Sequence, residues 1–273
     1  MSYVAIPISD PAVLGPRLRG TPLVVMLDID GTLAPLVERP EDTIVSMEAR
    51  AAISALTRAP GVHTAVITGR SVTDAQRLVP IVDVVIIGNH GAELVRPGSD
   101  PTVHPDVAAH QEAVARAARA VGEIAAHFAG VRLEDKTWTL SVHYRQADPA
   151  VEPRLRAALE RVAAREGLSF FGGKKIFELR PAVRVHKGTA ALQLARDLEG
   201  LGPGASLLFA GDDVTDEDAF RDLRAHHPAA VTIRVAHDPE TDTAAEFLVA
   251  DHEGIRALLE WLAEFRGAPV QHS

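Results

Sequence analysis

The fold of this chain is inferred from one segment, Val24-Val25-Met26-Leu27-Asp28-Ile29-Asp30-Gly31-Thr32-Leu33. Its apolar beginning has the length of a buried strand, and two carboxylates follow where that strand should end. Open α/β sheets bind ligands beyond the carboxyl ends of their strands. Because side chains alternate along a strand, Asp28 and Asp30 should point the same way while Ile29 points back. A bare Asp-x-Asp is usually an acidic turn, but the apolar lead-in and the Gly-Thr-Leu tail argue against that interpretation.

On both sides of this segment, short apolar runs alternate with longer amphipathic ones. Early in the chain, we expect strands at 23–27, 62–68 and 83–87 and helices that begin at Ser46 and Ser71, since serine is a common N-cap. After Pro181 the alternation returns, with helices at 187–198, 215–223 and 252–265 and strands at 206–210, 231–235 and 247–249. This order predicts a mainly parallel sheet with helices on its faces.

The middle of the chain has a different order. After a Pro- and Gly-containing break at 97–101, a helix (106–128) precedes strands at 131–135 and 138–145, and a helix (150–166) precedes strands at 168–171 and 175–180. Strands joined by tight connections favour an antiparallel sheet. We therefore expect an α/β protein in which residues 1–101 and 182–273 form one domain and residues 102–181 form an inserted α+β domain of ordinary size.

Composition excludes several classes of function. The 273 residues carry a net charge of −9 and lack a cluster of Lys and Arg, which argues against a nucleic-acid partner. The absence of cysteine excludes disulfides, thiolate catalysis and zinc sites built on sulfur, and it is typical of the cytoplasm. The apolar runs are far shorter than the roughly 20 residues that cross a bilayer, and the N-terminal residues lack a signal-peptide pattern. We expect a cytoplasmic monomer without a membrane partner.

Three more segments complete a set of four motifs. They are Ala65-Val66-Ile67-Thr68-Gly69-Arg70-Ser71, Val185-His186-Lys187-Gly188 and the acidic run from Leu208 to Phe220. Each is weak alone, because Thr68 could be an N-cap, Lys187 a surface lysine and the acidic run a solvated loop. In this order, the four resemble the motifs of the haloacid-dehalogenase-like phosphatases. The resemblance implies a Rossmann-like core with a parallel sheet, and it makes the inserted domain a cap.

The resemblance also implies a mechanism. Phosphate monoesters need up to about 10²¹-fold acceleration, and a carboxylate nucleophile divides the reaction into two easier steps. Asp28 would form an aspartyl-phosphate, and Asp30 would serve as general acid and base. An ordinary aspartate has a pKa of about 3.9, so Asp30 would need an environment that raises its pKa. Thr68 and Lys187 would stabilise the charge on the migrating phosphoryl group.

A magnesium site is part of the same resemblance. Mg²⁺ prefers hard oxygen ligands, and the ligands implied are Asp28, the backbone carbonyl of Asp30 and Asp212. Asp213 and Asp216 are weaker candidates for a place behind these ligands. His186 departs from the pattern, since Asp or Asn is expected before the lysine, and this change could alter how Lys187 is positioned.

Within the superfamily, the sequence resembles the trehalose-6-phosphate phosphatases. The matching features are the segments 88–93, 133–136, 143–145 and 177–181. By this resemblance, Glu134, Lys136 and Glu178 would contact the distal glucose. The full set of implied substrate-binding residues is Thr68, Gly69, Arg70, Asn89, His90, Glu134, Lys136, His143, Arg145, Glu178 and Lys187. The alternative for the charged residues of the cap is a set of cross-strand ion pairs.

The function implied is Mg²⁺-dependent hydrolysis of trehalose 6-phosphate, a step of trehalose biosynthesis, with a small sugar phosphate as partner. Three alternatives stay open. A phosphatase for sucrose phosphate or glucosylglycerate phosphate would share the core and differ in the cap. A phosphomutase of the superfamily would keep both aspartates and return the phosphate to sugar. A non-catalytic sensor would normally have lost an aspartate or the lysine, and all are present here.

Overall fold

The strand predicted ahead of Asp28 is β2 (Leu23–Leu27), the middle strand of a large sheet. The structure, a computed structural model, describes residues 5–173, 175–236, 238 and 241–267. Within these residues the large sheet has the strand order β1-β13-β12-β11-β2-β3-β4-β5-β6. In this spatial order, every pair of neighbouring strands between β1 and β4 is parallel. The next pair, β4 with β5, is antiparallel. The other strands are β1 (Ile6–Pro7), β3 (Val62–Ile67), β4 (Val85–Gly88), β5 (Glu93–Val95), β6 (Thr102–Val103), β11 (Ser206–Gly211), β12 (Val231–Val235) and β13 (Phe247–Val249).

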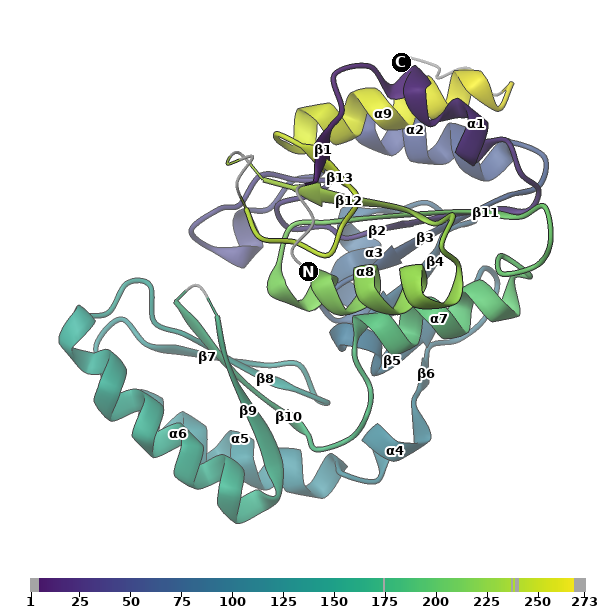
Figure 1. Cartoon of the computed structure of the whole chain (residues 1–273). Helices are drawn as coiled ribbons and strands as arrows, with labels where there is room; N and C mark the ends of the chain where they lie inside the picture. The colour runs from purple at the N-terminus through teal and green to yellow at the C-terminus, as the bar shows by residue number, and fades with distance from the viewer. Residues whose placement is uncertain (1–4, 174, 237, 239–240, 268–273) are drawn as a thin grey trace. The chain divides into compact units, whose positions relative to one another are not determined.

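Helices cover both faces of this sheet (Figure 1). One face packs against α1 (Gly15–Leu18), α2 (Met47–Arg58), α3 (Val72–Leu78) and α9 (His252–Phe265), and the other against α7 (Lys187–Asp197) and α8 (Val214–His226). In β2, Val25 and Leu27 join the first apolar cluster, whereas Val24 and Met26 join the second. A strand buried on both faces reads as a continuous apolar run, which is why this segment stands out in the sequence. The predicted α/β fold with a parallel sheet is confirmed.

The predicted helix starts are also confirmed. The hydroxyl of Ser46 accepts a hydrogen bond from the N–H of Ala49 at 3.1 Å, and the hydroxyl of Ser71 accepts one from Asp74 at 3.2 Å. The short strands β1, β5 and β6 were not expected, because two or three residues are too few to show a period. Short 3₁₀ turns occupy Pro11–Leu14, Pro40–Asp42, Asn89–Gly91 and Pro149–Val151.

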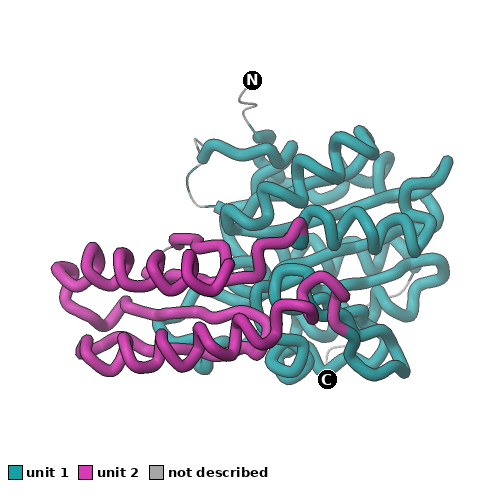
Figure 2. The backbone as a smooth tube through the Cα atoms, turned by 90° about the horizontal axis from the view of Figure 1, so that it is seen from below, with its two compact units in different colours: residues 1–102, 185–273 teal, residues 103–184 magenta. Residues whose placement is uncertain are grey.

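The chain divides into two compact units (Figure 2), residues 1–102 with 185–273 and residues 103–184. The domain borders predicted from the sequence fall after residues 101 and 181. The smaller unit, called the cap here, has an antiparallel sheet of order β7-β8-β10-β9. Its elements are α4 (Pro105–Ala108), α5 (Gln111–Ala125), β7 (Arg132–Asp135), β8 (Leu140–His143), α6 (Glu152–Glu166), β9 (Leu168–Gly173) and β10 (Ile176–Pro181).

The helix expected at 106–128 is two helices in the structure, α4 and α5. At the break, the N–H of His110 donates to the carbonyl of Val107 at 2.9 Å. The carbonyl oxygen of Asp106, which an unbroken helix would use there, lies 2.9 Å from Nδ1 of the His110 ring. A side chain that takes a backbone partner in this way competes with the helix, and the amphipathic pattern does not reveal it. Among the described residues, every helix is too short or too polar to span a bilayer.

Candidate active site

A buried ammonium group lies between two carboxylates at the carboxyl end of β2. Lys187, the first residue of α7, places Nζ 2.9 Å from Oδ1 of Asp28 and 2.8 Å from Oδ1 of Asp216. Asp28 and Lys187 are only 4% and 2% exposed. The N–H of Asp28 donates to the carbonyl of Ala210 at 3.0 Å, so the pairing of β2 with β11 continues up to this carboxylate. The structure therefore brings the first, third and fourth motifs together.

The acidic run of the fourth motif forms a turn that Asp216 holds in place. Oδ2 of Asp216 accepts hydrogen bonds from the N–H groups of Asp212 and Asp213, at 3.1 and 3.0 Å. Asp213 is the N-cap of α8, and Asp213 with Asp216 forms a reciprocal capping box. Because both oxygens of Asp216 have partners, this residue anchors Lys187 and the turn.

The cluster fits a divalent cation. Carboxylate oxygens of Asp28, Asp212 and Asp216 lie within 4.8 Å of one another. Burial raises the pKa of Asp28 well above its usual value in spite of the nearby Lys187. Burial, together with the charges of Asp216 and Asp213, raises the pKa of Asp212 to about 7. A bound cation would compensate this crowding of negative charge. Mg²⁺, which favours oxygen ligands, matches the donors present.

Gly31 keeps the space beside Asp212 open. Its φ of +78° lies in the left-handed region that glycine adopts readily. A Cβ atom at this position would overlap the carboxylate of Asp212. The Gly of the first motif is therefore required twice, for the sharp exit from the strand and for the approach of Asp212.

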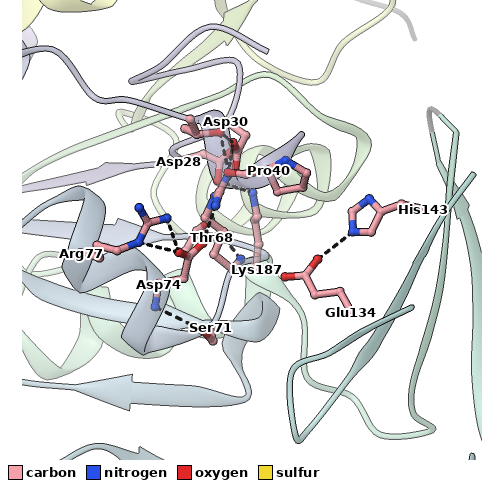
Figure 3. A network of polar contacts seen from close by, with 12 residues as sticks. Asp28, Asp30, Pro40, Thr68, Ser71, Asp74, Arg77, Glu134, His143 and Lys187 are labelled. Carbon is pink, nitrogen blue, oxygen red and sulfur yellow. Dashed lines mark hydrogen bonds and ion pairs between the residues drawn. The ribbon is translucent and has the colours of Figure 1, made fainter. Parts of the chain in front are cut away.

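Asp30 has a different set of partners from Asp28. Arg70 binds it through two hydrogen bonds, Nε to Oδ2 and Nη2 to Oδ1, both at 2.7 Å. Arg70 also donates to Asp74 and, at 2.7 Å, to the hydroxyl of Thr43. Arg77, one turn along α3, donates to the other oxygen of Asp74 at 2.7 Å (Figure 3). The second motif thus holds the second carboxylate of the first.

The charges of this network shift the pKa of two members. Burial works to lower the pKa of Arg70, but the hydrogen bonds and charges of Asp30 and Asp74 together raise it. Burial works to raise the pKa of Asp74, but Arg77 and Arg70 together lower it. Both groups are therefore held in their charged forms.

Two backbone segments lock together beside this network. The N–H of His90 donates a hydrogen bond to the carbonyl of the buried Thr68 at 2.9 Å. The N–H of Asn89 donates one to the carbonyl of Arg70 at 2.7 Å. The ring of His90 packs against the Cα of Gly69 so closely that any side chain there would collide with it. The predicted residues Thr68, Gly69, Arg70, Asn89 and His90 therefore form one structural group.

Asn89 and His90 both have left-handed backbone conformations, with φ of 48° and 58°. Glu93 supports this strained turn, since its Oε2 accepts from Nδ2 of Asn89 at 2.7 Å and from the N–H of Val72 at 3.1 Å. Strain of this kind persists only where the surroundings enforce it, and it is frequent at functional sites. Glu93 was not predicted as a site residue, although it closes the motif Gly88–Glu93.

In the cap, three of the predicted residues, Glu134, His143 and Glu178, share one face of the sheet. The apolar cluster of the cap takes Leu140, Val142, Phe177 and Leu179 from β8 and β10, together with residues of α5 and α6. The residues between them in sequence lie on the opposite face, because side chains alternate along a strand. This second face, called the open face here, carries Glu134, Ser141, His143, Phe171, Glu178 and Arg180.

Polar contacts join the residues of the open face. Oε2 of Glu134 lies 2.7 Å from Nε2 of His143 (Figure 3). Glu178 accepts from the hydroxyl of Ser141 at 3.2 Å and from the guanidinium of Arg180. Lys136 and Arg145 follow β7 and β8 and lie outside the strands. Sequence reasoning missed Ser141 and Arg180, and the signal that could have found Arg180 is its spacing of two from Glu178.

Comparison with known sequences now places the chain. The sequence profile of trehalose-phosphatases matches residues 26–253. The chain belongs to the trehalose-phosphatase family. The matched range includes the first motif from Met26 onward, the other three motifs and the whole cap.

Two relatives and one solved structure show how much of each protein this chain matches. The trehalose-phosphate phosphatase of Mycolicibacterium paratuberculosis is 32% identical over 88% of this chain and 61% of that protein. An uncharacterised glycosyl hydrolase of Mycobacterium tuberculosis is 35% identical over 93% of this chain, but only 19% of that protein is covered. The chain thus spans less than two thirds of the length of these relatives. A crystal structure of a trehalose-6-phosphate phosphatase related protein superimposes with a TM-score of 0.76 at 30% identity, over 88% of this chain and 97% of that one.

Proposed function

We propose that this chain hydrolyses trehalose 6-phosphate to trehalose and inorganic phosphate, with Mg²⁺ and through an aspartyl-phosphate on Asp28. The observation that carries the proposal is the buried contact between Lys187 and Asp28 at the carboxyl end of β2. Membership in the trehalose-phosphatase family supports the substrate. We propose a small sugar phosphate as the partner of a monomeric, cytoplasmic protein.

In the first step, an oxygen of Asp28 forms a bond to phosphorus while the bond from phosphorus to the sugar oxygen breaks. Lys187 reduces the repulsion between the nucleophilic carboxylate and the phosphate, because its ammonium is held within 2.9 Å of Asp28. Asp216 keeps Lys187 in this place and binds the turn that carries Asp212. Thr68 would donate its hydroxyl to a phosphoryl oxygen.

The cation has a limited role in this proposal. Asp28, Asp212 and the carbonyl of Asp30 would hold Mg²⁺, which supplies positive charge beside the phosphoryl oxygens when bound. Asp216 stands behind these ligands, since both of its oxygens already have partners.

Asp30 would move the protons. It would protonate the sugar oxygen as that group leaves, and would then take a proton from the attacking water. As that water bonds to phosphorus, the bond between phosphorus and Asp28 breaks, which releases inorganic phosphate and restores the Asp28 carboxylate. Arg70 would position Asp30 for this role, because its guanidinium donates hydrogen bonds to both oxygens of Asp30. One of these oxygens must carry the transferred proton, so the hold of Arg70 on that oxygen loosens when Asp30 acts as an acid.

A panel of phosphate esters tests the proposal. Phosphate release would be measured with trehalose 6-phosphate, sucrose phosphate, glucosylglycerate phosphate and glucose 6-phosphate, with Mg²⁺ present. The highest kcat/KM is expected with trehalose 6-phosphate. A preference for another ester would leave the phosphatase core and overturn the substrate, and conversion of one sugar phosphate to another without phosphate release would indicate a phosphomutase.

A further inference from the structure

Phe171 is an exposed aromatic side chain beside polar residues, on the edge strand β9 of the cap sheet. It lies on the open face of the cap sheet and is 46% exposed, whereas its neighbour Phe170 packs against the apolar cluster on the other face. The apolar cluster therefore gives no reason for a phenyl ring at this position. Single exposed apolar residues are common, so the neighbours of Phe171 decide whether it has a function.

The strand register places Phe171 in one row with three polar residues. Phe171 on β9 is opposite Glu178 on β10, Glu178 is opposite Ser141 on β8, and Ser141 is opposite Glu134 on β7. Directly opposed residues share a face and lie near each other. The aromatic ring is therefore the fourth member of a row that contains two of the carboxylates predicted to contact a sugar.

Arg180 connects the ring to this row. Its guanidinium carbon lies 4.7 Å from the centroid of Phe171, within the range of a cation–π contact. The same guanidinium is paired with Glu178. Arg180 is only 9% exposed, so the contact limits the orientations of both the ring and the carboxylate. The aromatic side chain and the polar groups beside it are thus held as one unit.

This arrangement matches the chemistry of a pyranose ring. A pyranose presents C–H groups on its faces and hydroxyls around its rim. The face of an aromatic ring is electronegative and apolar, so it can pack against such C–H groups. Carboxylate and guanidinium groups at its side can bind the rim hydroxyls through charge-assisted hydrogen bonds.

We propose that Phe171 is a platform on which a sugar ring of the substrate packs, with Glu178 binding hydroxyls of that ring. The proposal rests on the proposed function, since it requires a glycosyl phosphate as substrate. It adds a residue that contributes through apolar contact to a site otherwise predicted from charged side chains.

Phe171→Ala tests the proposal by kinetics. The measured quantity is the ratio of kcat/KM for trehalose 6-phosphate to kcat/KM for p-nitrophenyl phosphate, which has no sugar. This ratio should fall about tenfold, because the phenyl ring no longer covers the apolar C–H groups of the sugar. Phe171→Trp should restore the ratio to within about threefold of the original, since it keeps an aromatic face. Phe265→Ala is the matched control, because Phe265 is 44% exposed and stacks on Trp261 in the larger unit. Its ratio should be unchanged.

A binding measurement separates packing from catalysis. Calorimetry with the Asp28→Asn protein should show trehalose 6-phosphate binding about tenfold more weakly once Phe171→Ala is added, and thermal unfolding would verify that the double variant is folded. An unchanged ratio and unchanged affinity would overturn the platform even if the wild-type protein prefers trehalose 6-phosphate. If the wild-type protein prefers a different glycosyl phosphate, the same comparison made with that ester still decides the platform. A wild-type protein without preference for any glycosyl phosphate would overturn both proposals.

Discussion

The two sheets of this protein treat charged side chains in opposite ways. The large sheet is covered on both faces, and its charged groups at the end of β2 are buried and bound to one another, as Lys187 is to Asp28 and Asp216. The cap sheet is covered by α5 and α6 on one face, and Glu134 and Glu178 lie partly exposed on the other. The first arrangement fixes the positions of a few charged atoms, and the second leaves polar groups partly exposed.

Substitutions in the two sheets should therefore have different effects. A change at the buried charges of the larger unit should affect every substrate, because the phosphoryl group is common to all of them. A change on the open face of the cap should affect only substrates that carry a distal sugar, because binding energy from remote groups is used at the transition state.

Asp28→Asn should reduce kcat by about 10³-fold or more, for trehalose 6-phosphate and p-nitrophenyl phosphate alike. The amide keeps the shape of the side chain but is not a nucleophile. Phosphate release with both esters is the measurement. Near-normal turnover of either ester would contradict the role of Asp28.

Asp216→Asn should lower the free energy of unfolding by about 3 kcal/mol, because it removes one carboxylate from the buried ammonium of Lys187. Asp218→Asn, two residues along α8, is the control. Asp218 is partly exposed and paired with Arg221 at 3.0 Å, and its loss should cost less than about 1 kcal/mol. Urea unfolding measures both, and equal costs would show that burial does not distinguish the two sites.

Glu178→Ala should reduce kcat/KM for trehalose 6-phosphate by about 100-fold and act far less on p-nitrophenyl phosphate. Glu160→Ala is the control, since Glu160 is an exposed residue of α6. The ratio of the two kcat/KM values is the readout. If both substrates lose activity equally, Glu178 supports the fold of the cap and does not contact the sugar.

Magnesium affinity should weaken about tenfold for each pH unit below 7, since binding requires the loss of one proton from Asp212. Burial and the charges of Asp216 and Asp213 raise the pKa of Asp212 to about 7 in the folded chain, above the value of about 3.9 expected in the unfolded chain. Between these values the folded state binds more protons, so the metal-free protein should lose stability as pH rises toward 7. Added Mg²⁺ should therefore raise the melting temperature more at pH 8 than at pH 6.

Thermal unfolding with EDTA and with Mg²⁺ at both pH values is the measurement for this last prediction. Activity should also disappear after treatment with EDTA and return with Mg²⁺. A shift in melting temperature that is equal at the two pH values would separate metal binding from the protonation of Asp212. Full activity after exhaustive chelation would contradict the magnesium site.

The sequence alone was sufficient for features that depend on near neighbours. Period, apolar runs and serine caps predicted the strand before Asp28 and the helices after Ser46 and Ser71, because these signals lie within a few residues of the structure that they specify. The break at His110 escaped this reasoning, since a side chain there takes a backbone partner that an unbroken helix would use. The resemblance of four ordered motifs was sufficient for the family.

Tertiary structure alone decided which charged groups meet. Arg70 lies 40 residues from Asp30 and binds it because β3 pairs with β2, and Asp216 reaches Lys187 because α8 follows the strand beside β2. The row from Glu134 to Phe171 likewise depends on the register of four strands. Contacts between distant segments, and the burial that raises the pKa of Asp212, arise only when the chain packs, and a local sequence pattern carries no record of them.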